Sequence, residues 1–212
     1  MKFKSELFFI GDKINKILNK NPISDLLLFS GPGTGKTTFC QHYIKWYEEN
    51  IGGYTIVYES GEKFGVDDAR KLVEYLELHE KALIVFDEGE VIEPKAQISL
   101  RSIITNPNYT FIICTNRISQ LPPEFRDRFV NIDCNIPSDT DTCANLKDWM
   151  QKYSPELLEI VEKKEKMMFI TVFHLNFFGS IRDLFRKIEN RSFQRQHDKT
   201  NDFEFLQNIK DP

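Results

Sequence analysis

Five short apolar runs recur along the first two thirds of the chain, and polar or amphipathic stretches separate them. The runs cover 26–29, 54–59, 82–87, 110–115 and 129–134. Their apolar residues are mostly continuous instead of alternating, which is typical of strands buried on both faces of a parallel sheet. Helical patterns fill the gaps, over 13–19, 37–49, 66–79 and 94–104. This alternation predicts an α/β fold with a doubly wound, five-stranded parallel sheet.

The pattern changes after the fifth run. Ile-Pro-Ser-Asp at 136–139 breaks it, and the chain beyond is helical without further strand signals. We therefore expect an α/β core over 1–137 and a small helical subdomain over 138–190, in which Ser154 caps an internal helix. The apolar stretch 167–178 is too short to span a bilayer and is interpreted as a buried helix. Residues 191–212 form either a frayed tail or a short partner-binding peptide around 203–206.

A glycine-rich loop joins the first predicted strand to the helix that follows. It consists of Ser30, Gly31, Pro32, Gly33, Thr34, Gly35, Lys36, Thr37 and Thr38. Its glycines let successive N–H groups point into one anion-sized hollow, and the helix N-terminus adds its positive end. Lys36 is expected to reach the β- and γ-phosphates, and the Thr37 hydroxyl to ligate Mg²⁺. Ser30 replaces the usual first glycine, but a small serine can start the same turn, so the loop predicts binding of ATP or GTP.

Polar residues end the third and fourth predicted strands. Asp87 and Glu88 follow four apolar residues and face the loop from the carboxyl end of a strand. Asp87 can hold Mg²⁺ through water, and Glu88 can polarise an attacking water. Asn116 ends the next run and is expected to orient the same water, although a polar residue after a buried strand is also ordinary.

Composition narrows the class of protein. The 212 residues, 41% of them hydrophobic, suit one α/β domain with an appendage. The net charge of −4 means that any contact with nucleic acid needs a local basic patch. The four cysteines form no C-x-x-C pair, which argues against a zinc ribbon and a disulfide framework. We expect a reducing compartment, either cytoplasmic or otherwise intracellular (nucleoid, nucleus or host cytoplasm), and no membrane association.

The order of these motifs resembles the AAA+ ATPases, and finer stretches resemble the small subunits of clamp loaders such as replication factor C. Those stretches are GVDDAR at 65–70, PKAQISLR at 94–101 and GSIR at 179–182. The resemblance covers about residues 8–190. It implies a P-loop NTPase core, a helical lid, ATP and Mg²⁺ as cofactors, and a homo- or hetero-oligomer joined through ATP-bridged interfaces. It also implies DNA and a sliding clamp, or another replication protein, as partners.

Two arginines at the start of the fifth run compete for one implied role. Arg128 occupies the place of the family's Ser-Arg-Cys arginine finger, which reaches the ATP of a neighbouring subunit. Because its flanking residues depart from that pattern, Arg126 remains an alternative. A guanidinium that arrives from a neighbour stabilises charge on the γ-phosphate, so turnover would depend on assembly. Either arginine can instead be a surface charge paired with Glu124 or Asp127.

Further nucleotide contacts follow from the resemblance. Arg182 matches the second sensor arginine and is expected to close over the γ-phosphate of its own subunit; the alternative is a solvated helix arginine. Ile10 and Gly11 lie where the family packs its adenine base.

The resemblance also implies residues that either relay a signal to the acidic pair or contact DNA. Gln97 and Arg101 lie four residues apart and share one helix face, which suits either a relay to the acidic pair or a structural polar face. Basic residues that could track phosphates are Arg101 itself, Lys63, Arg70 and Lys71.

Three functions remain open at this point. The first is a clamp-loader-like ATPase in replication or repair; clamp-loader subunits also have an opening segment and a C-terminal helical collar, for which we expect no room here. The second is another AAA+ loader or remodeller, of the helicase-loader or transposition-regulator type. The third is an ATP-gated scaffold with negligible turnover. Glu88, Asn116 and Arg182 favour turnover over the third, and the helix around Gln97 favours the first over the second.

Overall fold

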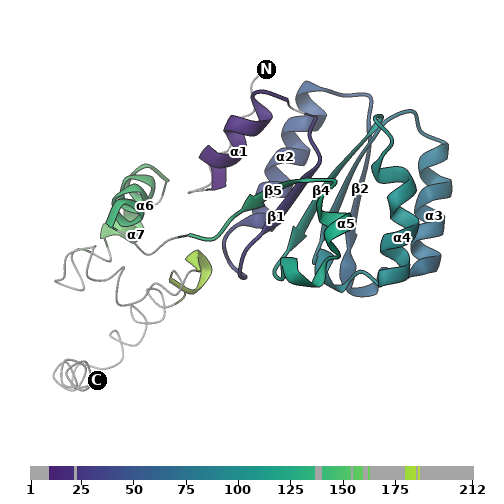
Figure 1. Cartoon of the computed structure of the whole chain (residues 1–212). Helices are drawn as coiled ribbons and strands as arrows, with labels where there is room; N and C mark the ends of the chain where they lie inside the picture. The colour runs from purple at the N-terminus through teal and green to yellow at the C-terminus, as the bar shows by residue number, and fades with distance from the viewer. Residues whose placement is uncertain are drawn as a thin grey trace, which may run out of the picture. The chain divides into compact units, whose positions relative to one another are not determined.

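The computed structural model describes residues 10–21, 23–136, 140–153, 155–159, 162, 180–184 and 186. The chain divides into two compact units, residues 1–136 and 137–212. The domain limits expected from the sequence stay a prediction. The helices of the first unit are α1 (Ile10–Leu18), α2 (Lys36–Asn50), α3 (Val66–Glu77), α4 (Pro94–Ile104) and α5 (Pro123–Arg126) (Figure 1). Its strands are β1 (Leu26–Phe29), β2 (Thr55–Ser60), β3 (Ala82–Asp87), β4 (Tyr109–Thr115) and β5 (Val130–Asp133).

All five strands are parallel and lie in the order β2-β3-β4-β1-β5. The α/β class and the five-stranded parallel sheet predicted from the sequence are confirmed. β1 lies between β4 and β5, and Phe29 at its end is in register with Thr115 and Asp133. The loop after β1 therefore emerges between the carboxyl ends of two other strands, which is where ligands bind in open α/β sheets.

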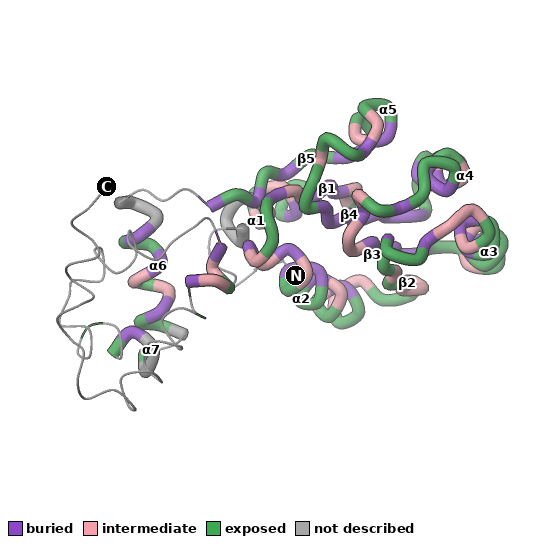
Figure 2. The backbone as a smooth tube through the Cα atoms, turned by 90° about the horizontal axis from the view of Figure 1, so that it is seen from below, coloured by how far each residue is buried: buried purple, intermediate pink, exposed green. Residues whose placement is uncertain are grey.

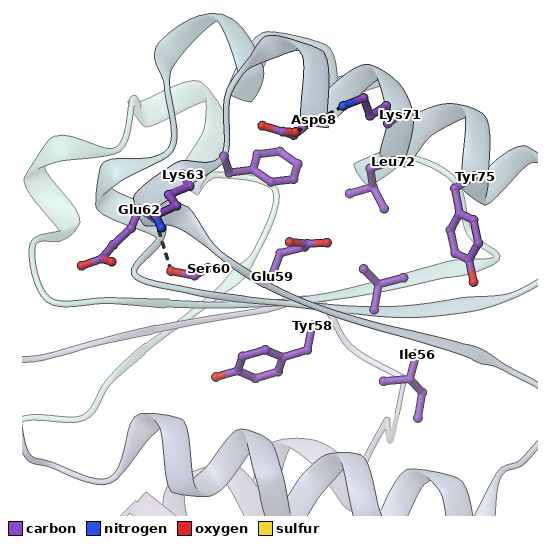
Figure 3. A pocket seen from close by; sticks show the side chains of 12 residues that line it. Ile56, Tyr58, Glu59, Ser60, Glu62, Lys63, Asp68, Lys71, Leu72 and Tyr75 are labelled. Atoms are coloured by element: carbon purple, nitrogen blue, oxygen red, sulfur yellow. Dashed lines mark hydrogen bonds and ion pairs between the residues drawn. The ribbon is translucent and has the colours of Figure 1, made fainter.

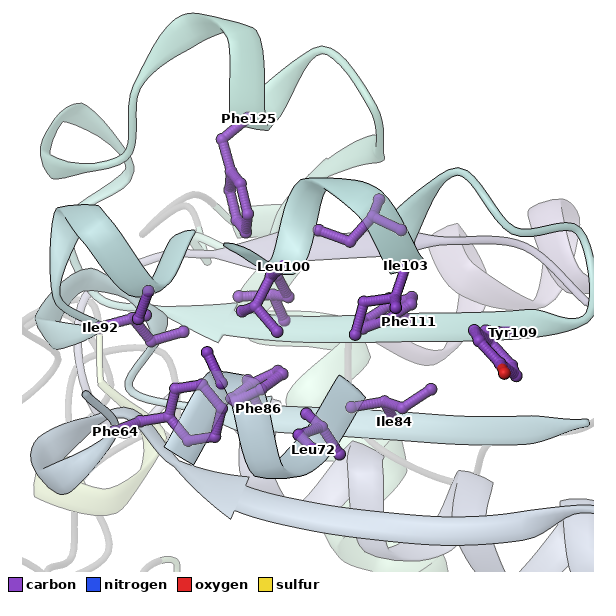
Figure 4. Packing of buried hydrophobic residues seen from close by; sticks show 14 of the residues in the cluster. Phe64, Leu72, Ile84, Phe86, Ile92, Leu100, Ile103, Tyr109, Phe111 and Phe125 are labelled. Carbon is purple, nitrogen blue, oxygen red and sulfur yellow. The ribbon is translucent and has the colours of Figure 1, made fainter. Parts of the chain in front are cut away.

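Two hydrophobic clusters hold the helices to the sheet, because alternate residues of each central strand point to opposite faces. On β3, Ile84 and Phe86 join the cluster under α3, α4 and α5, while Leu83 and Val85 join the one under α1 and α2. Figure 4 shows the first cluster, and Figure 2 shows the buried central strands between helices whose outer sides are exposed. Burying one such side chain contributes about 1.5–3 kcal/mol, so these strands are the most stabilising part of the sheet.

Short elements depart most from the sequence pattern. The range of α4 matches the prediction, with Pro94 in its first turn, whereas α1 begins three residues earlier and α3 ends two earlier than expected. The helix α5 and the 3₁₀ turns Gly61–Lys63, Gly89–Val91 and Ile118–Gln120 were not predicted. Each is too short to show a hydrophobic period.

The second unit contains α6 (Thr140–Tyr153) and α7 (Pro155–Glu159). Cys143, Leu146 and Met150 are buried on α6 at helical spacing. The cap at Ser154, the helix over 167–178 and the tail over 191–212 lie outside the described residues. Within the described ranges, every helix is too short or too polar to cross a membrane.

Candidate functional site

The loop after β1 closes around the Lys36 side chain. Its Nζ donates hydrogen bonds to the carbonyl oxygens of Ser30 (3.1 Å) and Gly31 (2.9 Å), to Ser30 Oγ (3.0 Å) and to Asn116 Oδ1 (3.0 Å). The residue is only 7% exposed, and this burial lowers the pKa of Lys36. All four partners are uncharged oxygens, so the positive charge is held without a counter-ion in direct contact. Such an arrangement favours an incoming anion.

Glycines shape the mouth of this loop. Gly33 and Gly35 have φ of 78° and 98°, a left-handed backbone conformation that residues with a Cβ rarely adopt. Gly35 is also the N-cap of α2 and makes no side-chain cap hydrogen bond, so the first N–H groups of the helix are left for another acceptor. The loop and the helix N-terminus can therefore bind phosphate together.

Ser30 does more than replace a glycine. Its hydroxyl shares a hydrogen bond of 2.6 Å with Thr34 Oγ1 and also accepts one from Lys36. Its backbone N–H donates to Thr115 O at 3.3 Å. The backbone N–H thus ties the loop to β4, as that of a glycine would, whereas the hydroxyl binds Thr34 and the ammonium group of Lys36, which a glycine could not do.

The Asp87 carboxylate collects three donors at the end of β3. Oδ2 accepts from the Thr37 hydroxyl (2.8 Å) and the Tyr58 hydroxyl (3.2 Å), and Oδ1 accepts from the Glu88 N–H (3.0 Å). The two groups expected to hold Mg²⁺, Thr37 and Asp87, therefore lie in contact. Both are oxygen ligands, which suit Mg²⁺. Among the described residues, no group of three or more His, Cys, Asp or Glu is arranged to hold a metal ion, so a hard cation here would need phosphate oxygens or water as well.

The backbone of Glu88 is strained. With φ 56° and ψ 43°, it is the one non-glycine residue of positive φ in the described part of the chain. Such a conformation costs of order 1–3 kcal/mol and persists only where the surroundings enforce it. Gly61 packs so closely on the Glu88 carbonyl that a Cβ there would collide with it, and Gly89 packs as closely on Ile113. These contacts hold the turn that aims Glu88.

The Glu88 side chain lies among other carboxylates. Burial raises the pKa of Glu88, and the charges of Glu62, Asp87 and Glu90 raise it further. A long hydrogen bond of 3.5 Å from the Ser60 hydroxyl opposes this. A carboxylate with a raised pKa is a better proton acceptor than an ordinary glutamate.

Two side chains fix the neighbouring strand ends. Glu90 Oε2 accepts from the Asn116 N–H at 3.0 Å, and Asn135 Oδ1 accepts from the Gly31 N–H at 3.3 Å. Burial acts to raise the pKa of Glu90, but hydrogen bonds, including the one from Asn116, bring it below its ordinary value. Sequence reasoning missed Glu90, Asn135 and Tyr58. Asn135 follows the fifth strand just as Asn116 follows the fourth, so the same signal was available; the other two carried none.

Gln97 links α4 to the turn after Glu88. Its Nε2 donates to Ile92 O at 2.9 Å, and the Ile92 N–H donates to Gly89 O at 3.3 Å. Gln97 is 3% exposed. Gln97 Oε1 and Arg101 Nε are buried without a partner among the described residues. The helix face predicted from their spacing thus carries polar atoms inward.

The two arginines before β5 differ in exposure. Arg128 is exposed, whereas Arg126 is half-buried, and its Nε is buried without a partner among the described residues. Neither forms an ion pair with Glu124 or Asp127 in the structure as described.

The remaining predicted residues are spread over other elements. Arg70 is exposed and pairs with Asp67 at 3.2 Å. Ile10 and Gly11 form the first turn of α1. Arg182 is exposed in the second unit, in a helical turn that Ser180 caps by accepting the Asp183 N–H at 3.2 Å.

A separate groove of about 830 Å³ runs along the edge strand β2 and under α3 (Figure 3). Its lining includes Tyr58, Glu59, Lys71 and Tyr75 but no residue of the loop after β1. The loop, unlike this groove, combines a buried ammonium group with the N-terminus of a helix, an arrangement that suits a phosphate group.

Comparison with known proteins gives one family and several relatives. Residues 26–135 match the model of the family described as "ATPase family associated with various cellular activities (AAA)". The chain is 24% identical to Replication factor C subunit 3 of Oryza sativa subsp. japonica over 131 residues, 56% of this chain and 36% of that protein. It is 25% identical to the Probable replication factor C subunit 5 of Dictyostelium discoideum over 154 residues, 68% of this chain and 44% of that protein.

A further curated protein and one solved structure are also similar to the chain. Replication factor C subunit 5 of Homo sapiens is 26% identical over 125 residues, 54% of this chain and 37% of that protein. The chain thus spans less than half the length of the curated relatives that it matches. A DNA polymerase III gamma subunit-related protein from Thermotoga maritima superposes with a TM-score of 0.45 at 14% identity, over 82% of this chain and 68% of that chain.

Proposed function

Because the chain belongs to the AAA family of ATPases, we propose that it hydrolyses ATP at interfaces between subunits and thereby drives assembly or remodelling on DNA in replication or repair. The observation that carries this proposal is the meeting of Lys36, Thr37, Asp87, Glu88 and Asn116 at the carboxyl ends of β1, β3 and β4. The similarity to replication factor C subunits supports the clamp-loader-like form of this function.

The loop grips the triphosphate. Lys36 turns from the carbonyl oxygens of Ser30 and Gly31 to the β- and γ-phosphates, and the N–H groups of the loop and of α2 surround the same oxygens. Thr37 and Asp87 hold Mg²⁺. When bound, the ion supplies positive charge beside the phosphates. Ile10 and Gly11 pack the adenine base.

Glu88 accepts a proton from the attacking water, and Asn116 orients that water. The raised pKa of Glu88 supports this role, because an acceptor with a higher pKa takes a proton more readily. The strained, left-handed backbone of Glu88 orients its carboxylate toward the attacking water.

Arginines complete the site from two directions. Arg128 reaches the γ-phosphate bound to a neighbouring subunit, and its exposure supports this choice over the half-buried Arg126. Arg182 closes over the γ-phosphate in its own subunit. Stabilising negative charge on the γ-phosphate from a neighbour makes hydrolysis depend on assembly.

DNA and a sliding clamp, or another replication protein, are the proposed partners, inside the cell and away from membranes. Lys63, Arg70, Lys71 and Arg101 contact the DNA backbone. Phosphate contacts predict an affinity that falls steeply with salt. Filter binding of primed DNA between low and high salt, with an ATP analogue present, tests this; a flat salt dependence would remove DNA from the proposal.

Mixed subunits test the shared site. Arg128→Ala chains retain their own nucleotide loop, and Lys36→Ala chains retain their arginine. If the finger acts in trans, mixing two inactive variants restores part of the phosphate release. Arg126→Ala in place of Arg128→Ala is the control. The absence of rescue at every mixing ratio, or of any larger assembly with an ATP analogue, contradicts hydrolysis at interfaces.

A further inference from the structure

One side-chain donor to Asp87 comes from outside the nucleotide loop. The Tyr58 hydroxyl donates to Asp87 Oδ2 at 3.2 Å, beside the 2.8 Å hydrogen bond that the same oxygen receives from Thr37. Tyr58 belongs to β2, the edge strand next to β3. Oδ2 is therefore held from two sides, by the first turn of α2 and by the edge of the sheet.

The register of the sheet explains the reach of Tyr58. Ser60 is level with Asp87, and Tyr58 is level with Val85, two residues before the end of β3. Figure 3 shows Tyr58 and Ile56 on the opposite side of β2 from Glu59 and Leu72. Ile56 packs with the cluster under α2, so the phenol lies on the face from which Thr37 approaches. A long, rigid side chain at this position spans the distance to the strand end.

We propose that Tyr58 is a positioning residue for the Mg²⁺ site, because its hydroxyl holds the Asp87 carboxylate in the orientation that the cation needs. This inference rests on the proposed function. Oδ1 is already fixed by the Glu88 N–H at 3.0 Å. The Thr37 hydroxyl can ligate a cation through a lone pair while its proton still binds Oδ2, so Thr37 and Tyr58 together would fix this oxygen from α2 and from the sheet.

An ordinary phenol keeps its proton at neutral pH, so the Tyr58 hydroxyl is available as a donor. The residue is 44% exposed, so removal of the hydroxyl alone opens no buried cavity.

The test compares Tyr58→Phe with wild type in the full chain. Calorimetry measures ADP binding without metal, and electron paramagnetic resonance measures Mn²⁺ binding in the presence of ADP. We expect metal-free ADP affinity to change by less than about twofold, while the Mn²⁺ concentration for half-saturation rises about three- to tenfold, as for the loss of one typical hydrogen bond at a partly exposed site.

Tyr75→Phe is the matched control. Tyr75 lines the same groove from α3 and is 45% exposed, but it makes no hydrogen bond to Asp87. It should bind Mn²⁺ like wild type. Unchanged or tighter Mn²⁺ binding in Tyr58→Phe overturns the inference, and so does an equal loss of metal-free ADP affinity, which would indicate a structural role alone. Failure of the wild-type chain to bind ADP at all would instead overturn the proposed function, and this inference with it.

Discussion

Lys36 Nζ lies 3.0 Å from Asn116 Oδ1, so the Asn116 side chain at the end of β4 holds the ammonium group of Lys36. The Asn116 backbone is fixed independently, because its N–H donates to Glu90 at 3.0 Å. The amide side chain can therefore exchange Lys36 for a phosphate or water partner without movement of β4. This arrangement couples the occupancy of the loop to the neighbouring strand end.

Replacing Lys36 should remove nucleotide binding. Lys36→Ala deletes a charge-assisted contact to the phosphates, and we expect ATP affinity to fall by at least about a hundredfold. Calorimetric titration measures this. Lys45→Ala removes an exposed lysine from the same helix and should bind ATP like wild type. Equal affinity of Lys36→Ala and Lys45→Ala would place the phosphates elsewhere.

The fall of the hydrolysis rate at low pH should follow the protonation of Glu88. Its pKa is raised, by burial first and then by Glu62, Asp87 and Glu90. Glu88 must be ionised to accept a proton, so kcat falls as pH decreases through this raised pKa. Glu62→Gln removes one of the neighbouring negative charges and should move this fall to lower pH. Steady-state phosphate release across pH measures the fall; a shift to higher pH in Glu62→Gln would contradict the assignment.

Gly61 should be needed for both stability and turnover. A Cβ at Gly61 would collide with the Glu88 carbonyl, so Gly61→Ala must displace the strained turn. We expect a loss of about 1–3 kcal/mol in the free energy of unfolding, as for other overpacked sites, together with slower hydrolysis. Gly65→Ala is the control, because its Cβ would lie 3.5 Å from the Glu93 carboxylate, an ordinary contact. Urea unfolding and phosphate release measure both effects. Identical behaviour of the two variants would mean that the turn tolerates displacement.

Asp25 should make stability depend on pH. Its Oδ1 accepts from the Phe111 N–H at 2.7 Å, and burial raises the pKa of Asp25 against that hydrogen bond. The folded state then holds the proton more tightly than the unfolded chain, so the stabilisation from this group is lost as pH rises through the folded pKa. Asp25→Asn keeps the acceptor without the charge.

We therefore expect Asp25→Asn to raise Tm by about 1–4 °C at neutral pH, and this gain to shrink as the wild-type carboxyl becomes protonated in acid. Thermal unfolding followed by circular dichroism at several pH values measures it. The exposed Asp127→Asn is the control and should show no such trend. A lower Tm for Asp25→Asn at neutral pH would show that the charge stabilises this position.

The sequence predicted those parts of the fold whose signal is local. The strand that ends at Asp87 otherwise consists of continuous apolar residues because both of its faces are buried. Its observed range, Ala82–Asp87, is the predicted one. The loop from Ser30 to Thr38 is equally local, since its glycines and lysine all fall within residues 31–36.

Contacts between elements could not be predicted in the same way. Whether Tyr58 reaches Asp87 depends on which residue of β2 is level with which residue of β3, and nothing in either strand specifies that register. The left-handed turn at Glu88 depends on Gly61, which is distant in sequence. Ser30 was expected only to be tolerated, whereas its hydroxyl bonds both Thr34 and Lys36.

Titration with ATP and Mg²⁺, combined with measurement of phosphate release, tests the central claim most directly. The wild-type chain should show heat of binding and release phosphate, whereas Glu88→Gln should bind ATP and release phosphate about 10²–10⁴-fold more slowly. If the wild-type chain shows neither heat nor phosphate release with ATP or GTP, the loop is not a nucleotide site. Normal turnover in Glu88→Gln would leave binding intact but contradict the proposed role of Glu88.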